Sequence, residues 1–168
     1  MEAKLILFTS IFILAPFSAF SWDDYCTHVI DVKTGNGNSA TTYATVSLEF
    51  RDKYINRLNI TNLQSRGIMS KSHYYFRRGN LDTFAVKGRC FNTSICSMTL
   101  SHDNTGVSPD WYVDYVEITS ITPNHGCRKL KFTVNAWLAA DKPPLGSASR
   151  GVYLCDEIIG QTRDYSEH

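Results

Sequence analysis

Ala44-Thr45-Val46-Ser47-Leu48-Glu49-Phe50 is the stretch that decides the fold class, because apolar and polar residues alternate along it without a break. Successive side chains of an extended strand point to opposite faces, so this alternation predicts a strand with one dry face and one wet face. The same period of two recurs in Lys129-Leu130-Lys131-Phe132-Thr133-Val134.

Other segments extend this pattern in both directions along the chain. We predict further strands over residues 28–33, 81–86, 95–102 and 112–121. Runs rich in Gly, Asn and Asp separate the strands at 34–38, 78–80, 103–106 and 123–126. No stretch carries a sustained helical stripe, and the only helical candidate is a short segment over 62–69. Many short strands divided by turns predict an all-β sandwich or closed barrel.

Residues 1–21 have the pattern of a signal peptide. Lys4 precedes an almost wholly apolar run over 5–17, and Ala19 and Ser21 supply the small residues expected before cleavage at Trp22. The run is short for a membrane span, which needs about 20 residues, although an uncleaved anchor is the alternative. We therefore expect a mature domain over 22–157 and a polar tail over 158–168, in the endoplasmic reticulum lumen or outside the cell.

Composition and cysteine usage agree with one such domain. The 168 residues include 17 Lys and Arg against 16 Asp and Glu, so bulk charge gives no attraction to nucleic acid. The cysteines all follow the cleavage site, and they are Cys26, Cys90, Cys96, Cys127 and Cys155. An oxidising lumen would pair four of them, and zinc is a weaker alternative because no Cys-x-x-Cys occurs. Two sequons predict glycosylation at Asn59 and Asn92, and therefore exposure of both residues.

Four segments in order resemble the PLAT, or lipoxygenase-homology, domain. The strongest is Leu100-Ser101-His102-Asp103-Asn104-Thr105-Gly106 followed by Trp111-Tyr112-Val113-Asp114-Tyr115. Phe76-Arg77-Arg78-Gly79-Asn80-Leu81-Asp82-Thr83-Phe84 lies upstream, and Phe132-Thr133-Val134-Asn135-Ala136-Trp137-Leu138 lies downstream. The cysteine positions are similar to those of small plant stress-associated PLAT proteins, and the match spans about 26–155.

The resemblance implies an antiparallel β-sandwich of two four-stranded sheets, association with the endoplasmic reticulum, and a role in abiotic-stress tolerance and growth. It implies lipid, a membrane surface or a protein as partner. Val113 stands where close relatives often carry Cys, which implies Cys90–Cys96 and Cys26–Cys155 bridges and a free Cys127. For that free thiol, a buried and inert position is the favoured interpretation over a reactive one.

Calcium is disfavoured by a second departure from the family. Many members carry an acidic residue where this chain has Tyr43, and calcium needs several oxygen ligands. We therefore expect no cofactor, with calcium possible but weakened by Tyr43.

No catalytic constellation is found in the sequence. It lacks the Gly-x-Ser-x-Gly elbow, His-Glu-x-x-His and phosphate-loop motifs. His102 and Asp103 are interpreted as a turn that bonds backbone amides, and Asp82 as a partner of backbone or Arg78. Phe84, Trp111 and Trp137 are interpreted as packing residues.

The candidate binding surface comprises Tyr74, Tyr75, Arg77 and Arg78, because aromatic rings mixed with cations suit headgroups or proteins. The alternative is that the rings alternate into the core. Residues 142–145 form a second candidate loop. The leading hypothesis is a non-enzymatic lipid- or membrane-binding module. The alternatives are a module that binds a lumenal or secreted protein and, more weakly, a carbohydrate-binding sandwich.

Overall fold

The computed structural model describes residues 25–54, 56–122, 126–142 and 146–156. The predicted signal peptide and the predicted polar tail lie outside the described residues, as do residues 143–145 of the second candidate loop.

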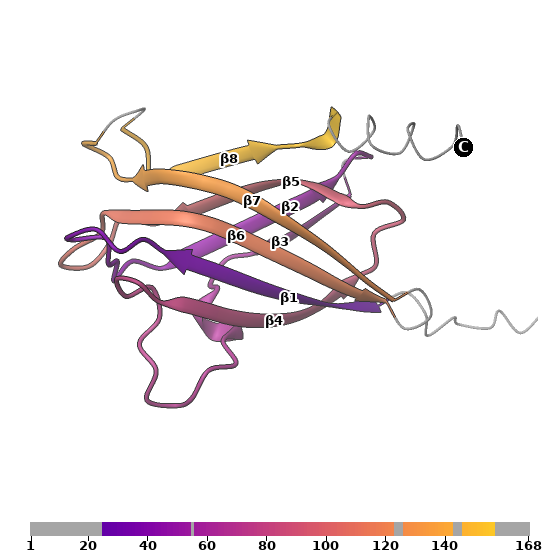
Figure 1. Ribbon diagram of the computed structural model, residues 1–168, viewed down its shortest axis with the longest axis horizontal. Coiled ribbons are helices and arrows are strands. Elements are labelled where there is room, and N and C mark those ends of the chain that lie inside the picture. Colours follow the sequence, from indigo (N-terminus) through magenta and orange to yellow (C-terminus); the bar gives the residue numbers. More distant parts are fainter. Residues whose placement is uncertain (1–24, 55, 123–125, 143–145, 157–168) are drawn as a thin grey trace, which may run out of the picture.

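Two antiparallel four-stranded sheets face each other (Figure 1), which confirms the predicted sandwich. The first sheet has the order β4-β1-β6-β7 and the second has the order β3-β2-β5-β8. The strands are β1 (Tyr25–Thr34), β2 (Val46–Asp52), β3 (Arg57–Ile60), β4 (Leu81–Arg89), β5 (Ile95–His102), β6 (Trp111–Thr122), β7 (Gly126–Leu138) and β8 (Ser149–Tyr153).

The predicted strands are all present, and two short edge strands were not predicted. The expected strand over 95–102 coincides with β5, and those over 28–33, 81–86 and 112–121 lie within β1, β4 and β6. The helical candidate over 62–69 is reduced to one 3-10 turn at Gln64–Arg66. The edge strands β3 and β8 carry little alternation, because in each of them the residues on both faces are largely polar or exposed.

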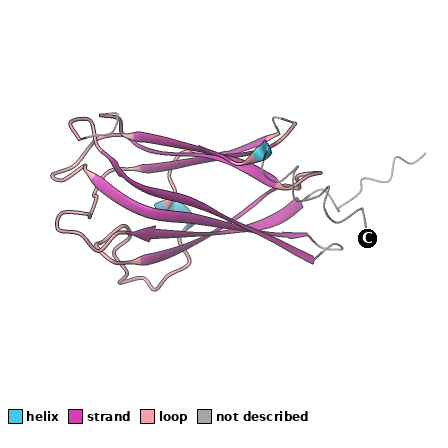
Figure 2. Ribbon diagram, turned by 45° about the horizontal axis from the view of Figure 1, so that its top comes forward, coloured by secondary structure: helices cyan, strands magenta, loops and turns pink. Residues whose placement is uncertain are grey.

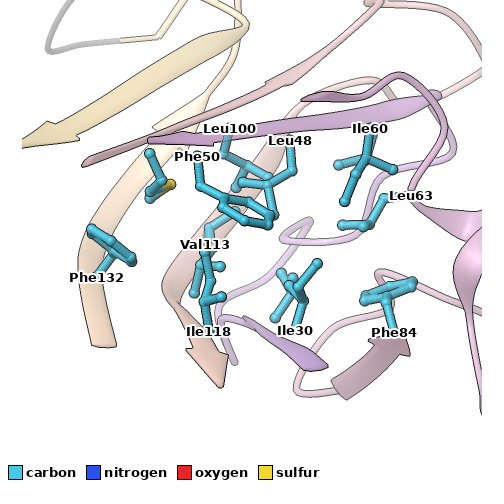
Figure 3. Packing of buried hydrophobic residues seen from close by; sticks show 14 of the residues in the cluster. Ile30, Leu48, Phe50, Ile60, Leu63, Phe84, Leu100, Val113, Ile118 and Phe132 are labelled. Carbon is cyan, nitrogen blue, oxygen red and sulfur yellow. The ribbon is translucent and has the colours of Figure 1, made fainter. Parts of the chain in front are cut away.

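The core lies between the inward faces of the two sheets (Figures 2 and 3). Residues of the deciding stretch supply one side of it, and Val46, Leu48 and Phe50 are fully buried. Ile30 and Phe132 of the facing sheet are also fully buried. Burial of a side chain of this size stabilises the fold by about 1.5–3 kcal/mol. Apolar residues at every second position therefore favour the packing of the two sheets against each other.

The four cysteines predicted to form bridges do so, but in different pairs. Cys26 is bonded to Cys90 and Cys96 is bonded to Cys155. The implied Cys90–Cys96 and Cys26–Cys155 pairs are therefore wrong. The reason is strand order: β1 lies beside β4 and β5 lies beside β8, which brings the Cα atoms of the bonded pairs to 4.9 and 4.7 Å.

Each bridge closes one sheet at the end where β1 and β5 begin. We call this end of the sandwich the bridged end, and the opposite end, where β1 and β5 finish, the loop end. Cys127 is free, as predicted, but it is exposed, so the interpretation as a buried thiol is wrong.

Candidate binding surface at the loop end

Backbone hydrogen bonds tie three loops together at the loop end. The loops are residues 35–45, 67–80 and 103–110. The amide of Thr42 donates to the carbonyl of Phe76 at 3.2 Å, and the amide of Gly79 donates to the carbonyl of Gly35 at 3.0 Å. The hydroxyl of Thr42 donates to the carbonyl of Pro109 at 2.8 Å. Because each loop is bonded to another, they form one continuous surface.

A buried turn decides which side chains of residues 74–77 reach that surface. Phe76 has a left-handed backbone with φ of 58°, and its ring is buried. Its amide donates to the fully buried carboxylate of Asp82 at 2.7 Å, and His73 Nε2 lies 2.5 Å from the other carboxylate oxygen. Few residues other than Gly adopt this backbone conformation unless their surroundings hold it. The turn directs Phe76 inward, while the preceding Tyr74 and the following Arg77 remain at the surface.

Arg77 lies against two tyrosine rings. Its guanidinium carbon is 3.7 Å from the ring centroid of Tyr43 and 5.6 Å from that of Tyr74. Tyr43 is 54% exposed and Tyr74 is 72% exposed. We name Tyr43, Tyr74 and Arg77 the arginine–tyrosine cluster. A cation over an aromatic face is attracted by the ring quadrupole, by about 0.5–2 kcal/mol, so the cluster holds the guanidinium in place.

The structure brings together three of the four residues predicted as a binding surface. Tyr74, Arg77 and Arg78 share the loop end, where Arg78 Nη1 donates to Asn38 Oδ1 at 3.0 Å. Tyr75 does not belong to this surface. Its ring packs 5.1 Å from that of Phe84, and its hydroxyl accepts the amide of Met69 at 3.2 Å. The alternative that these rings pack into the core is therefore correct for Tyr75, although Tyr75 and the adjacent Phe76 both pack inward and do not alternate.

Two members of the surface were not predicted. Tyr43 was noted only for the acid it replaces, and Val107, from the neighbouring loop, is 91% exposed. Gly106, next to Val107, approaches Tyr43 so closely that an added Cβ would lie 3.2 Å from the Cβ of Tyr43. A large apolar residue within a turn-forming stretch was the available signal for Val107.

His102 and Asp103 form the turn that was predicted. Asp103 Oδ1 accepts the amides of Thr45 and Thr105, both at 3.1 Å, and the Thr105 hydroxyl at 2.7 Å. These hydrogen bonds lower the pKa of Asp103 to about 2. His102 is buried, with Nε2 bonded to the carbonyl of Leu138 at 2.9 Å. Both side chains are thus occupied in joining loop and strand ends.

The remaining packing interpretations also hold in part or in full. Phe84 and Trp111 are fully buried, and Trp111 donates to the Thr34 hydroxyl at 3.0 Å. Trp137 is half-buried on the outer side of β7, with Lys142 Nζ 3.9 Å from its ring centroid. Asp82 does satisfy a buried amide, but the side chain that it pairs with is that of His73 and not that of Arg78.

Asn59 and Asn92, the residues of the two sequons, are both exposed. Asn59 lies on the edge strand β3, opposite Glu49 on the outer face of its sheet. Asn92 lies in the link between β4 and β5. Exposure is what attachment of a glycan requires, so both remain predicted glycosylation sites.

Within the described residues, no cluster of three or more His, Cys, Asp or Glu side chains is arranged to hold a metal ion. The same part of the chain contains no helix with the length and apolar character needed to cross a membrane.

Two antiparallel four-stranded sheets with hydrogen-bonded loops at one end are the architecture expected of a PLAT, or lipoxygenase-homology, domain, and the comparisons with known proteins agree with it. Coral 8R-lipoxygenase, for which calcium activation through a C2-like domain is described, aligns with a TM-score of 0.55 and 18% sequence identity. The alignment covers 83% of this chain and 20% of the lipoxygenase, so this chain spans about one fifth of that enzyme. At this identity the likeness establishes the fold alone.

The chain belongs to the Embryo-specific protein 3 (ATS3) family, whose model matches residues 16–141. PLAT domain-containing protein 2 of Arabidopsis thaliana is 34% identical over 149 residues, which cover 86% of this chain and 81% of that protein. PLAT domain-containing protein 3 of the same plant is 41% identical over 101 residues, or 59% of this chain and 97% of that protein. The resemblance predicted from the sequence is confirmed.

Proposed function

We propose that this chain is a non-enzymatic PLAT module of the secretory pathway that associates with a membrane surface through its loop end. The role in abiotic-stress tolerance and growth that the resemblance implies is part of this proposal. Two disulfides support an oxidising compartment, because such bridges form and persist there.

One observation carries the membrane part: at the loop end, exposed apolar and aromatic side chains lie beside cations. Tyr43, Tyr74 and Val107 are the exposed groups, and Arg77 and Arg78 are the cations. Tyrosine rings suit the membrane–water boundary because one end is apolar and the other is polar. A cation close to an anionic leaflet adds about 1 kcal/mol. A surface with both features fits a lipid headgroup layer.

The non-enzymatic part rests on how the candidate acid–base groups are used. Of the described histidines, His73 faces a carboxylate, that of Asp82, and this carboxylate is fully buried and also bonded to the Phe76 amide. The pair therefore fastens a turn. His28 Nδ1 lies 2.9 Å from the Ser120 hydroxyl, but the His28 side chain is fully buried, so this pair is not presented at a surface.

Co-sedimentation with lipid vesicles tests the proposal. Tyr74→Ala should reduce retention, because a 72% exposed ring at the loop end is removed. Tyr153→Ala is the matched control: Tyr153 is 64% exposed but ends β8 at the bridged end. Retention of the Tyr153 variant should equal that of the unmodified chain. Absence of retention on vesicles of every composition, with and without calcium, would refute membrane association and favour a protein partner, which proximity labelling in the lumen would then identify.

A further inference from the structure

Arg77 carries a positive charge that no carboxylate balances within the described residues. Its guanidinium lies on the rings of Tyr43 and Tyr74, and Nη1 is buried without a hydrogen-bond partner. None of the ion pairs formed by the described residues includes Arg77. A guanidinium N–H that is removed from water and left unbonded costs about 1–3 kcal/mol, so an anion that reached it would be bound favourably.

Two of the acids near the loop end, Asp103 and Asp110, are engaged elsewhere. The Asp103 carboxylate accepts the amides of Thr45 and Thr105. Asp110 Oδ2 lies 2.7 Å from Lys142 Nζ. Neither is bonded to Arg77. The cation is therefore held in position by aromatic faces and is not neutralised by either of these acids.

Additional positive charge surrounds it. Arg78 follows directly, and Lys33 Nζ donates to the carbonyl of Gly79 in the same turn. Neither residue is paired with a carboxylate among the described ion pairs. Arg77, Arg78 and Lys33 thus place three cations around one turn of a chain whose formal net charge is +1.

We propose that Arg77, held by Tyr43, binds the phosphate of an anionic phospholipid directly, so that the loop end engages anionic membranes without calcium. This inference rests on the proposed function and specifies its ligand chemistry. At this surface the guanidinium of Arg77, held by the tyrosine rings, is the cation that contacts the lipid phosphate. Tyr43 is the ring that holds it most closely. The planar N–H fork of Arg matches two phosphate oxygens, and the rings of Tyr43 and Tyr74 rest at headgroup depth.

The test is retention on phosphatidylcholine vesicles with and without phosphatidylserine, each measured in EGTA and in calcium. We expect retention to require phosphatidylserine and to be equal in both buffers. Arg77→Gln should weaken retention about fivefold, which corresponds to one cation at an anionic surface. Tyr43→Asp should weaken it as much, because a carboxylate placed against the guanidinium would neutralise it. Arg77→Lys keeps the charge without the planar stacking and should fall between these variants and the unmodified chain.

Arg51→Gln is the matched control. Arg51 is a partly exposed arginine that is paired with Glu49 on the outer face of the sheet β3-β2-β5-β8. Its retention should equal that of the unmodified chain, and near-ultraviolet circular dichroism should show native packing for every variant.

Three results would overturn the inference while leaving membrane association standing: retention only in calcium, equal retention without phosphatidylserine, or full retention of natively packed Arg77→Gln. Absence of retention on all vesicles would instead refute the proposed function itself. Direct binding of inorganic phosphate that is lost in Arg77→Gln, in the absence of any vesicle retention, would assign Arg77 to a free phosphate ligand and would also overturn the membrane proposal.

Discussion

Replacing Asp82 by Ala is expected to detach the turn that presents the arginine–tyrosine cluster. Asp82 is fully buried at the beginning of β4. One carboxylate oxygen accepts the amide of Phe76 at 2.7 Å, and the other lies 2.5 Å from His73 Nε2. Without that acceptor, the Phe76 amide is left buried and unbonded within a backbone turn of positive φ.

The expected loss follows from these two contacts. A hydrogen bond to a charged group contributes about 1.5–3 kcal/mol, and an orphaned buried donor costs about 1–3 kcal/mol. The two terms overlap because both describe the same Phe76 amide, so we expect Asp82→Ala to lower the free energy of unfolding by about 3 kcal/mol. Asp82→Asn retains an acceptor oxygen for that amide and should lose about 1 kcal/mol.

Urea unfolding of the oxidised chain at neutral pH measures these losses, and vesicle retention reports the consequence at the surface. Asp31→Ala is the matched control, since Asp31 is a half-buried acid on the adjacent strand β1 whose side chain accepts one hydrogen bond, from Thr83, at 2.6 Å. It should lose about 1 kcal/mol or less and keep full retention. A loss for Asp82→Ala no larger than that of Asp31→Ala would refute the reasoning.

The remaining predictions concern a buried histidine, the free thiol and the sequons. Burial lowers the pKa of His28. The stability that neutral His28 contributes is therefore complete above about pH 6.5 and is lost as the pH falls below that value. The urea midpoint of unfolding should drop on acidification, and it should drop less steeply in His28→Phe. Iodoacetamide applied to the native chain should alkylate Cys127 alone among its cysteines, and peptide mapping that found a blocked Cys127 would contradict its exposed position. Glycosidase treatment of the secreted chain should release glycan from both Asn59 and Asn92, whereas an unmodified asparagine at either sequon would count against that site.

Period two made the sandwich predictable, and its absence explains what was missed. Strands β2 and β5 are buried on one face along their whole length, so their apolar residues mark every second position. Edge strand β8 has no fully buried residue, and edge strand β3 has one, Ile60. An edge strand can be held largely by backbone hydrogen bonds, which do not depend on the type of side chain and so produce no alternating pattern in the sequence.

The binding surface was only partly predictable because tertiary contacts decide it. A strict alternation would place Tyr74 and Phe76 on one face and Tyr75 and Arg77 on the other. The positive φ of Phe76 breaks the alternation, so Tyr75 and Phe76 both pack inward. The contact between Tyr43 and Arg77 joins residues that are distant in sequence, and so does each disulfide. Spacing along the chain contains no information on such pairs until strand order is known.

The two ends of the sandwich are held by different kinds of bond, and this difference bears on function. At the bridged end, covalent bonds join β1 to the chain after β4 and β5 to the chain after β8. At the loop end, the three loops are held by hydrogen bonds and by the contact between Arg77 and Tyr43. Because neither bridge involves the loop end, its exposed side chains, such as those of Tyr74 and Val107, can change at less cost to folding than the buried Asp82. Tyr43 lies at this end, where its exposed ring holds the Arg77 guanidinium without contributing to the buried core.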